Sequence, residues 1–171
     1  MLNSEELINK VKSYNKFLNP EKLSKAYNFA VKAHKNQKRD SGDPYSNHPI
    51  AVASILTELK LDSATIATGL LHDTIEDTHA TYETIKKEFG QEVADLVDGV
   101  TKISVLENQA TSTSKAENFR KLILATSKDI RVLLVKIADR LHNMRTINAI
   151  SKIEKKERIA KETMEIYAPL A

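Results

Sequence analysis

The chain has 171 residues, with 26 Lys and Arg residues against 23 Asp and Glu residues, and it contains no Cys and no Trp. Its four Gly and four Pro residues are about 5% of the chain, against roughly 12% in an average protein, which argues against a turn-rich all-β sandwich or barrel. A hydrophobic content of 41%, a charged content of 29% and a mean hydropathy of -0.39 exclude extensive disorder and membrane spanning. Length and composition together predict one domain.

The missing cysteines and the distribution of charge narrow the classes of function. Disulfides, thiol nucleophiles and thiolate metal sites are excluded, so a metal ion would have to be held by His, carboxylate and water. The formal charge of +3 is spread over the chain, unlike the clustered basic face of a nucleic-acid-binding protein, and it favours a small polyanionic ligand. With no signal-peptide pattern and no membrane-spanning run, we expect a cytoplasmic protein with neither a nucleic-acid nor a membrane partner.

Capping residues and 3.6-residue periodicity predict helices in the first half of the chain. A helix from Asn19 would run to about His34, and helices starting at Pro49 and Asp62 would form an antiparallel pair, the second continuing through LLHDTIEDT. The buried stripe expected on the helix from Asn19 is Leu23, Ala26, Tyr27, Ala30 and Val31. The N-cap residues predicted along the whole chain are Asn3, Asn19, Asp62, Ser114, Asp129 and Ser151.

The second half completes a predicted all-α fold. A helix from Thr81 would close at Gly90, a typical C-terminal glycine, and another would follow directly. Residues 104–114 are polar and are expected to be irregular. In the apolar run IRVLLVKIADRLHNMRTINAI, the segment RVLLV could form a strand, but the helical spacing favours one helix of about twenty residues. A last helix through Tyr167 gives a compact bundle of about eight to ten helices.

A polar loop between the second and third predicted helices precedes the first candidate ligand. Residues 36–47, NQKRDSGDPYSN, are the most turn-prone segment of the chain, and Tyr45 is their only aromatic side chain. His48 follows directly, where it could point inward from the start of a helix. Taken alone, such a histidine is more often structural than ligating.

Polar groups interrupt the apolar helix at LLHDTIEDT. In a continuous helix His72 and Glu76 are four residues apart, as are Asp73 and Asp77, so four titratable groups would share one side. Clustered carboxylates repel one another unless a cation neutralises them. The alternative interpretation is a solvated helix end with a few acidic residues.

A second group of polar side chains lies on one face of the long apolar helix. Asp139, Asn143 and Thr146 are spaced at i, i+4 and i+7 beside a Val, Leu and Ile stripe. They are flanked by Arg140, His142 and Arg145. The alternative interpretation is an exposed amphipathic face, and exposure is also what we expect of His142.

Together these segments supply two imidazoles and two carboxylates, from His48, His72, Asp73 and Asp139. This combination suits divalent ions such as Mn, Fe or Zn, and an octahedral ion would keep two positions for water or a phosphate oxygen. The residues alone therefore predict a metal-dependent phosphohydrolase.

The motifs resemble the hydrolase domain of the RelA/SpoT homologues, within the HD phosphohydrolase superfamily. The resemblance covers nearly the whole chain and implies one all-helical HD domain over residues 1–171. It also implies removal of the 3'-pyrophosphate from guanosine tetra- or pentaphosphate, with one Mn²⁺ ion as cofactor. The motifs are RDSGDPYSNHPIAVA (39–53), LLHDTIEDT (70–78), FGQEVADLVDGVTKIS (89–104), AENFRK (116–121), DIRVLLVKIADRLHNMRT (129–146) and ETMEIYAPLA (162–171).

The resemblance also implies roles for individual residues. The family's metal ligands fall on His48, His72, Asp73 and Asp139. Its catalytic acidic pair falls on Glu76 and Asp77, and its nucleotide contacts fall on Arg39, Ser41, Asn143 and Thr146. Asp40 departs from the pattern, because many members carry Lys there, and an acidic side chain would weaken attraction to an anionic ligand unless it faces solvent.

Two further functions stay open at this stage. The chain could act on another substrate of HD phosphohydrolases, such as the phosphate of NADPH, or it could be a module that binds the alarmone without turning it over. The sequence ends where long members of the family continue into a synthetase domain, so we expect no alarmone synthesis by this chain. For the oligomeric state, we take a monomer as the default. His34 and His79 are expected to be structural or solvent-facing.

Overall fold

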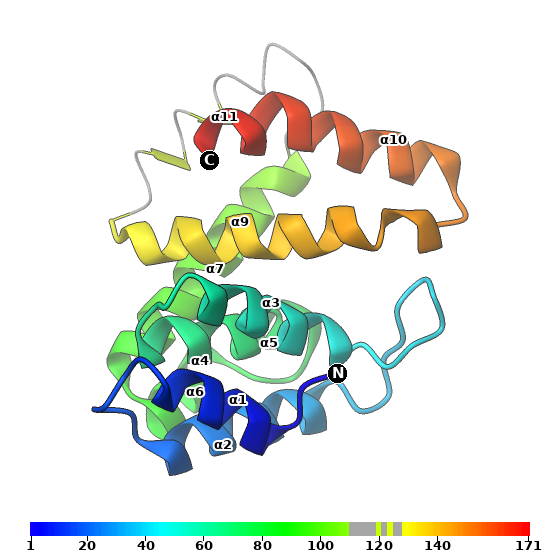
Figure 1. Ribbon diagram of the computed structural model, residues 1–171. Coiled ribbons are helices and arrows are strands. Elements are labelled where there is room, and N and C mark those ends of the chain that lie inside the picture. Colours follow the sequence, from blue (N-terminus) through cyan, green and yellow to red (C-terminus); the bar gives the residue numbers. More distant parts are fainter. Residues whose placement is uncertain (110–118, 121–122, 125–127) are drawn as a thin grey trace.

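Helices are the regular elements of the described chain, which confirms the predicted all-α fold (Figure 1). The computed structural model describes residues 1–109, 119–120, 123–124 and 128–171. Apart from an isolated bridge between Lys38 and Pro44, these residues form no β-structure. In chain order the elements are α1 (Ser4–Lys12), α2 (Pro20–Ala33), α3 (Asn47–Glu58), α4 (Ser63–Leu71), α5 (Thr74–Asp77), α6 (Tyr82–Phe89), α7 (Gln91–Gln109), α9 (Ile130–Arg145), a 3-10 turn (Ile147–Ala149), α10 (Ile153–Glu162), a π-helix (Thr163–Tyr167) and α11 (Ala168–Leu170).

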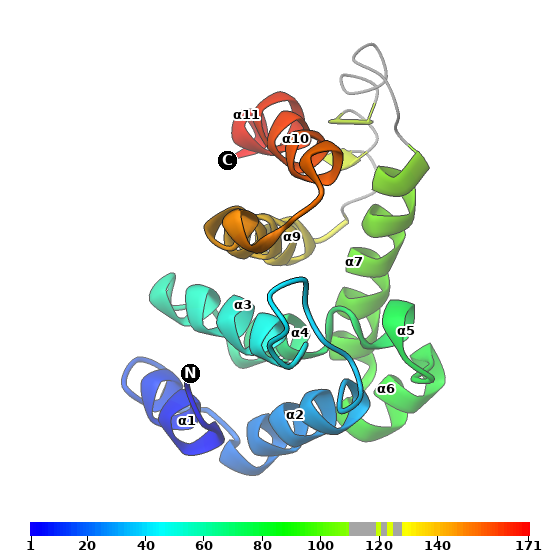
Figure 2. The ribbon, with the colours of Figure 1, turned by 90° about the vertical axis from the view of Figure 1, so that its right-hand side faces the viewer.

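The helices are stacked in layers. Figure 1 shows α1 and α2 at one end, the α3–α4 hairpin above them, α9 next, and α10 and α11 on the far side of α9. Figure 2 shows α7 running along the side of this stack, with α5 and α6 near its lower part. Because α9 contacts α3, α4, α7 and the C-terminal π-helix, polar side chains on α9 can be enclosed on several sides.

Several predicted helix ends are confirmed. The Asn3 side chain accepts from the Glu6 N–H while Glu6 reaches back to the Asn3 N–H, which is a complete capping box. The side chains of Asn19 and Asp129 likewise accept from the first backbone N–H groups of α2 and α9. Gly90 ends α6 with a φ of +94°, a conformation that glycine adopts without steric cost.

The helix predicted from Asp62 through Thr78 is instead broken after Leu71. His72 Nδ1 lies 2.7 Å from the Gly69 carbonyl oxygen, and the Thr74 hydroxyl donates to the Leu71 carbonyl at 2.7 Å. These side chains compete for carbonyls that the helix would otherwise use, so a turn separates α4 from the four-residue α5. Asp62 occupies the N-cap position, but its side chain makes no capping hydrogen bond.

The predicted irregular segment was wrong for residues 104–109, because α7 continues to Gln109. Ile103 is buried and Leu106 packs against the core, so the apolar face of the helix extends into this segment. The Ser104 hydroxyl donates to the Val100 carbonyl, which accommodates a polar residue within the helix. The predicted N-cap residue Ser114 lies outside the described residues.

The boundaries of α9 and α10 also differ from the predictions. The segment RVLLV is helical, which excludes the strand alternative, but α9 ends at Arg145 after 16 residues. The Thr146 hydroxyl donates to the His142 carbonyl at this end, so it competes with continuation of the helix. α10 begins at Ile153 with Lys152 as its N-cap residue, so the prediction of Ser151 as the N-cap residue was wrong.

Two smaller corrections concern α2 and α3. Val31 was expected in the buried stripe of α2 but is 37% exposed. The stripe is narrower than predicted, because the residues buried on α2 are Leu23, Ala26 and Ala30. α3 begins at Asn47, two residues before Pro49, so His48 lies within its first turn.

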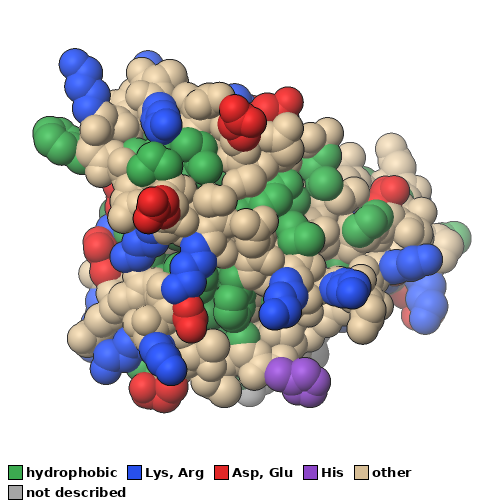
Figure 3. All heavy atoms as spheres, turned by 90° about the horizontal axis from the view of Figure 1, so that it is seen from below, with side chains coloured by type: hydrophobic (Ala, Val, Ile, Leu, Met, Phe, Trp, Pro, Cys, Tyr) green, Lys and Arg blue, Asp and Glu red, His purple; other side chains and the backbone are tan. Residues whose placement is uncertain are grey.

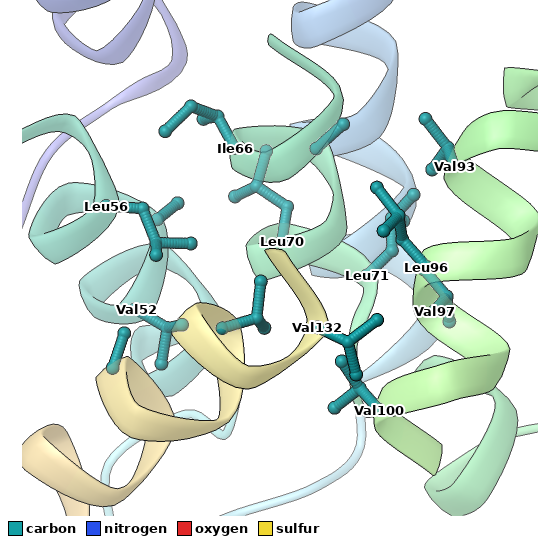
Figure 4. Packing of buried hydrophobic residues seen from close by; sticks show 14 of the residues in the cluster. Val52, Leu56, Ile66, Leu70, Leu71, Val93, Leu96, Val97, Val100 and Val132 are labelled. Atoms are coloured by element: carbon teal, nitrogen blue, oxygen red, sulfur yellow. The ribbon is translucent and has the colours of Figure 1, made fainter. Parts of the chain in front are cut away.

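The hydrophobic core lies where α3, α4, α7 and α9 meet (Figure 4). Leu70 and Leu71 of α4 are fully buried. A Cβ atom at Gly69 would lie 2.7 Å from Leu56 Cδ1 and 3.4 Å from Ala53 Cα, so glycine lets α4 approach α3 closely. This close packing fixes the C-terminal end of α4, from which His72 projects.

The outer surface mixes charged and apolar side chains. On the face shown in Figure 3, Lys and Arg side chains are interspersed with Asp and Glu side chains, and hydrophobic side chains lie between them in small groups. None of the helices in the described ranges is long and apolar enough to cross a membrane.

The fully buried Leu70 tests the packing. We expect Leu70→Ala to lower the free energy of unfolding by about 2 to 5 kcal/mol, because truncation leaves a cavity in a close-packed core. The control Leu59→Ala, at a side chain that is 56% exposed, should change it by less than about 1 kcal/mol. Urea unfolding followed by circular dichroism measures both, and equal effects would contradict this core.

Candidate metal centre

Three separate elements bring together the four predicted metal ligands. His48 lies in the first turn of α3, His72 and Asp73 form the turn between α4 and α5, and Asp139 lies in α9. His48 Nε2 is 2.9 Å from Asp139 Oδ1 and 3.6 Å from Asp73 Oδ2. His72 Nε2 is 3.1 Å from Asp73 Oδ2 and 3.7 Å from Asp139 Oδ1. Nε2 of each histidine therefore faces both carboxylates, and His48, His72 and Asp139 offer ligand atoms that all lie within 4.8 Å of one another.

The orientation of His72 fits a metal ligand. Its Nδ1 lies 2.7 Å from the Gly69 carbonyl oxygen and must carry a proton to bond there. In the neutral ring the Nε2 lone pair then points toward the two carboxylates, and this buried nitrogen has no hydrogen-bond partner in the described residues. A divalent cation would satisfy the nitrogen and neutralise the carboxylates at once. The donor set is that of a hard or borderline divalent ion.

His48 is oriented by a residue that we expected to be exposed. His142 is half-buried, and its Nδ1 lies 2.7 Å from Nδ1 of His48. Burial, together with the neighbouring His48 and Arg39, lowers the pKa of His142 to about 4, so the ring is neutral and can accept a hydrogen bond. When His48 donates from Nδ1, its Nε2 is left free to bind a metal ion, the usual arrangement for a ligating histidine.

Two side chains of α9, Lys136 and Asn143, hold Asp139. Lys136 Nζ donates to its Oδ2 at 3.1 Å, and Asn143 Nδ2 donates to its Oδ1 at 3.1 Å. Lys136 is itself buried and is also 2.9 Å from Glu107 Oε2. Glu107 in turn pairs with Arg140 and accepts from the Tyr167 hydroxyl at 2.8 Å. A buried charge network thus joins the metal centre to the C-terminal segment.

The charges in the centre shift one another's pKa values. Burial alone would lower the pKa of His72, but the carboxylates of Asp73 and Asp139 raise it well above its usual value. Burial alone would raise the pKa of Asp139, but Lys136 and the two imidazoles hold it well below its usual range. Asp73 is likewise held in the ionised form against its burial, chiefly by His72. The carboxylates are therefore ionised, and a bound metal ion would take the place of the proton that they stabilise on His72 Nε2.

The predicted catalytic pair lies on α5, next to the centre. Burial and the neighbouring carboxylates raise the pKa values of both Glu76 and Asp77. The Tyr45 hydroxyl is 3.3 Å from Asp77 Oδ2 and donates to Asp73 Oδ2 at 2.8 Å. α5 thus places two carboxyl groups with raised pKa values close to the predicted metal ligands.

A cleft of about 660 Å³ lies beside the centre, and all four predicted nucleotide contacts line it. Arg39 Nη2 donates to Asn143 Oδ1 at 3.3 Å and to Thr146 Oγ1 at 3.1 Å. Because Asn143 also donates to Asp139, one amide links the cleft to the metal centre. Ser41 lies on the same wall, where its hydroxyl donates to Asp43 Oδ2 at 2.8 Å.

Asp40 does not place an uncompensated negative charge in the cleft. Its carboxylate pairs with Lys155 of α10 at 2.6 Å, and both side chains are partly exposed at the rim. The cleft is also lined by Lys38, Arg39 and Arg145. Its lining therefore carries more cationic than anionic side chains.

Sequence reasoning missed two residues of the site. Tyr45 contacts both Asp73 and Asp77, and the available signal was an aromatic residue in an otherwise polar loop. Lys136 contacts Asp139, and its signal was a single lysine within the apolar run RVLLVKIA. His34 is a structural residue, as expected. It is 1% exposed, and its Nδ1 lies 2.7 Å from Gln37 Oε1. His79 is exposed, as expected.

Comparisons with known proteins agree with this fold. A model described as the HD domain matches residues 26–171. "GTP pyrophosphokinase rsh" of Brucella melitensis is 54% identical over 171 residues, which is all of this chain and 23% of that protein. "Bifunctional (p)ppGpp synthase/hydrolase SpoT" of Escherichia coli K12 is 53% identical over 150 residues, covering 88% of this chain and 21% of the relative.

A solved structure shares the architecture. It is described as a metazoan ortholog of SpoT that hydrolyses ppGpp, and it matches with a TM-score of 0.67 and 25% identity. The match covers 85% of this chain and 83% of the other. The chain therefore belongs to the HD domain family, and the resemblance to the RelA/SpoT homologues is confirmed. It spans about a quarter of the length of the curated relatives that it matches.

Removing one imidazole tests the metal centre. We expect His72→Ala to raise the dissociation constant for a divalent ion by more than about 100-fold, because loss of even an outer partner of a ligand costs 10- to 100-fold. Isothermal titration with Mn²⁺ or Zn²⁺ measures the constant. His79→Ala, which removes an exposed imidazole, is the control and should bind like the unmodified chain; unchanged binding by His72→Ala would refute this centre.

Proposed function

We propose that the chain removes the 3'-pyrophosphate from guanosine tetra- and pentaphosphate, with one Mn²⁺ ion held by His48, His72, Asp73 and Asp139. The observation that carries this proposal is the convergence of the four ligands beside a cationic cleft. The activities named for the E. coli relative and for the metazoan structure support the same substrate. The proposal treats residues 1–171 as one hydrolase domain that acts as a monomer on a free nucleotide in the cytoplasm.

The reaction is a hydrolysis at phosphorus. Water attacks the phosphorus attached to the ribose 3' oxygen, the bond between that phosphorus and the 3' oxygen breaks, and the 3' oxygen takes up a proton. The products are GDP or GTP and pyrophosphate. When bound, a divalent ion would supply Lewis-acid chemistry, polarising a phosphoryl oxygen and acidifying a water molecule.

In this proposal Glu76 and Asp77 accept and donate the protons of the reaction. Glu76 orients the attacking water and accepts its proton, and its raised pKa brings it closer to the range of an efficient general base at neutral pH. Asp77 shares this role, and a proton held on either carboxyl group is available to the leaving oxygen. Both groups lie on α5, directly after the ligand Asp73.

The cleft binds and orients the nucleotide. Arg39 is suited to neutralise phosphate oxygens, because its guanidinium offers several donors in a fixed plane. Asn143 and Thr146 hold this guanidinium at 3.3 and 3.1 Å and can exchange these contacts for contacts with the nucleotide. Ser41 supplies a hydroxyl on the same wall.

Product analysis of Glu76→Gln tests the proposed chemistry. With guanosine tetraphosphate and Mn²⁺, the unmodified chain should release GDP and pyrophosphate, and Glu76→Gln should lower kcat by about 10² to 10⁴, the usual contribution of general base catalysis. Glu83→Gln, at an exposed position of α6, is the matched control and should keep full activity. Metal affinity should be similar in all three proteins.

The same assay separates the alternatives. Release of phosphate from NADPH, with no turnover of guanosine tetraphosphate, would replace the proposed substrate. Tight binding of guanosine tetraphosphate at saturating Mn²⁺, with no products formed, would indicate that the chain is a binding module and not a hydrolase. Full activity of Glu76→Gln would contradict the role given to this carboxylate.

A further inference from the structure

The base of the loop between α2 and α3 is folded back on itself. The Gln37 N–H donates to the His34 carbonyl at 3.0 Å, and the Tyr45 N–H donates to the Gln37 carbonyl at 2.9 Å. His34 is almost fully buried, and its ring lies against the Tyr45 ring with centroids 4.8 Å apart. His34, Gln37 and Tyr45 therefore form a rigid base for the loop that carries Arg39.

This base is attached to α5. Gln37 Nε2 donates to the backbone carbonyl of Asp77 at 2.6 Å, while Gln37 Oε1 lies 2.7 Å from His34 Nδ1. The amide of Gln37 thus bridges the buried histidine and the end of α5. A helix of only four residues has little stability of its own, so such contacts determine where α5 sits.

The Tyr45 hydroxyl lies between two carboxylates that have different roles. It is 2.8 Å from Oδ2 of the metal ligand Asp73 and 3.3 Å from Oδ2 of Asp77. Among the side chains that the structure describes, Tyr45 is the hydrogen-bond partner of the Asp77 carboxylate. One hydroxyl therefore connects Asp77, one member of the acidic pair, to the proposed metal ligand Asp73.

We propose that Tyr45 is a positioning residue of the active centre, whose hydroxyl sets the carboxylates of Asp73 and Asp77 relative to each other. This inference rests on the proposed function, because Asp77 belongs to the proposed catalytic pair. Tyr45 acts through these two carboxylates, so its loss should affect the rate of the chemical step and the affinity for the metal ion. Nucleotide binding in the cleft should be little affected, although the ring of Tyr45 also lines the cleft.

Tyr45→Phe tests this role, because it removes the hydroxyl and keeps the ring against His34. We expect kcat for guanosine tetraphosphate at saturating Mn²⁺ to fall by about 10-fold or more, with KM changed less than 2-fold. The dissociation constant for Mn²⁺ in the absence of nucleotide should rise by about 10-fold, the size typical of losing an outer partner of a metal ligand. Tyr14→Phe is the matched control, since its half-buried hydroxyl donates to the Leu61 carbonyl at 2.9 Å and plays no part in the site.

The outcomes decide the inference. A fall in kcat and weaker Mn²⁺ binding in Tyr45→Phe alone support it. An unchanged kcat, an effect confined to KM, or an equal loss in Tyr14→Phe overturns it, because Tyr45 would then be only a wall of the cleft or a general packing residue. If the unmodified chain does not hydrolyse guanosine tetraphosphate, the proposed function is wrong, but the Mn²⁺ affinity still tests the role of Tyr45. An unchanged Mn²⁺ affinity in Tyr45→Phe then overturns this inference.

Discussion

In the interior of a helical bundle, each of two imidazole nitrogens lies 2.9 to 3.7 Å from two carboxylate oxygens. Ionised carboxylates are costly in such surroundings unless a cation accompanies them. Lys136 supplies part of the required positive charge to Asp139, and a divalent ion supplies the rest in our proposal. The surrounding helices serve mainly to hold these four groups in one place.

The packing of the helices explains how distant residues reach this point. Gly69 lets α4 lie close to α3, and the break after α4 turns His72 and Asp73 toward α9. The buried network of Glu107 and Arg140 braces α9 against the C-terminal segment. A metal centre built from three elements is therefore sensitive to the packing of all of them.

The sequence predicted most of the helices and singled out the four side chains that the structure brings together, because both depend on spacing and residue type. It did not predict the break at Leu71, since side-chain bonds from His72 and Thr74 to local carbonyls override the helical pattern there. The contacts of Tyr45 and Lys136 were also missed, because they join residues across tertiary contacts that no local periodicity encodes. His142 was predicted to be exposed but is half-buried, for the same reason, because its partner His48 is 94 residues away in the sequence.

Anomalous diffraction from crystals of the chain grown with Mn²⁺ would test the central claim most directly. We predict one strong peak within bonding distance of Nε2 of His48, Nε2 of His72 and one carboxylate oxygen each of Asp73 and Asp139. A fully occupied Mn²⁺ site elsewhere, with these four groups unchanged and joined only to one another, would contradict the claim that their convergence is built to hold a metal ion.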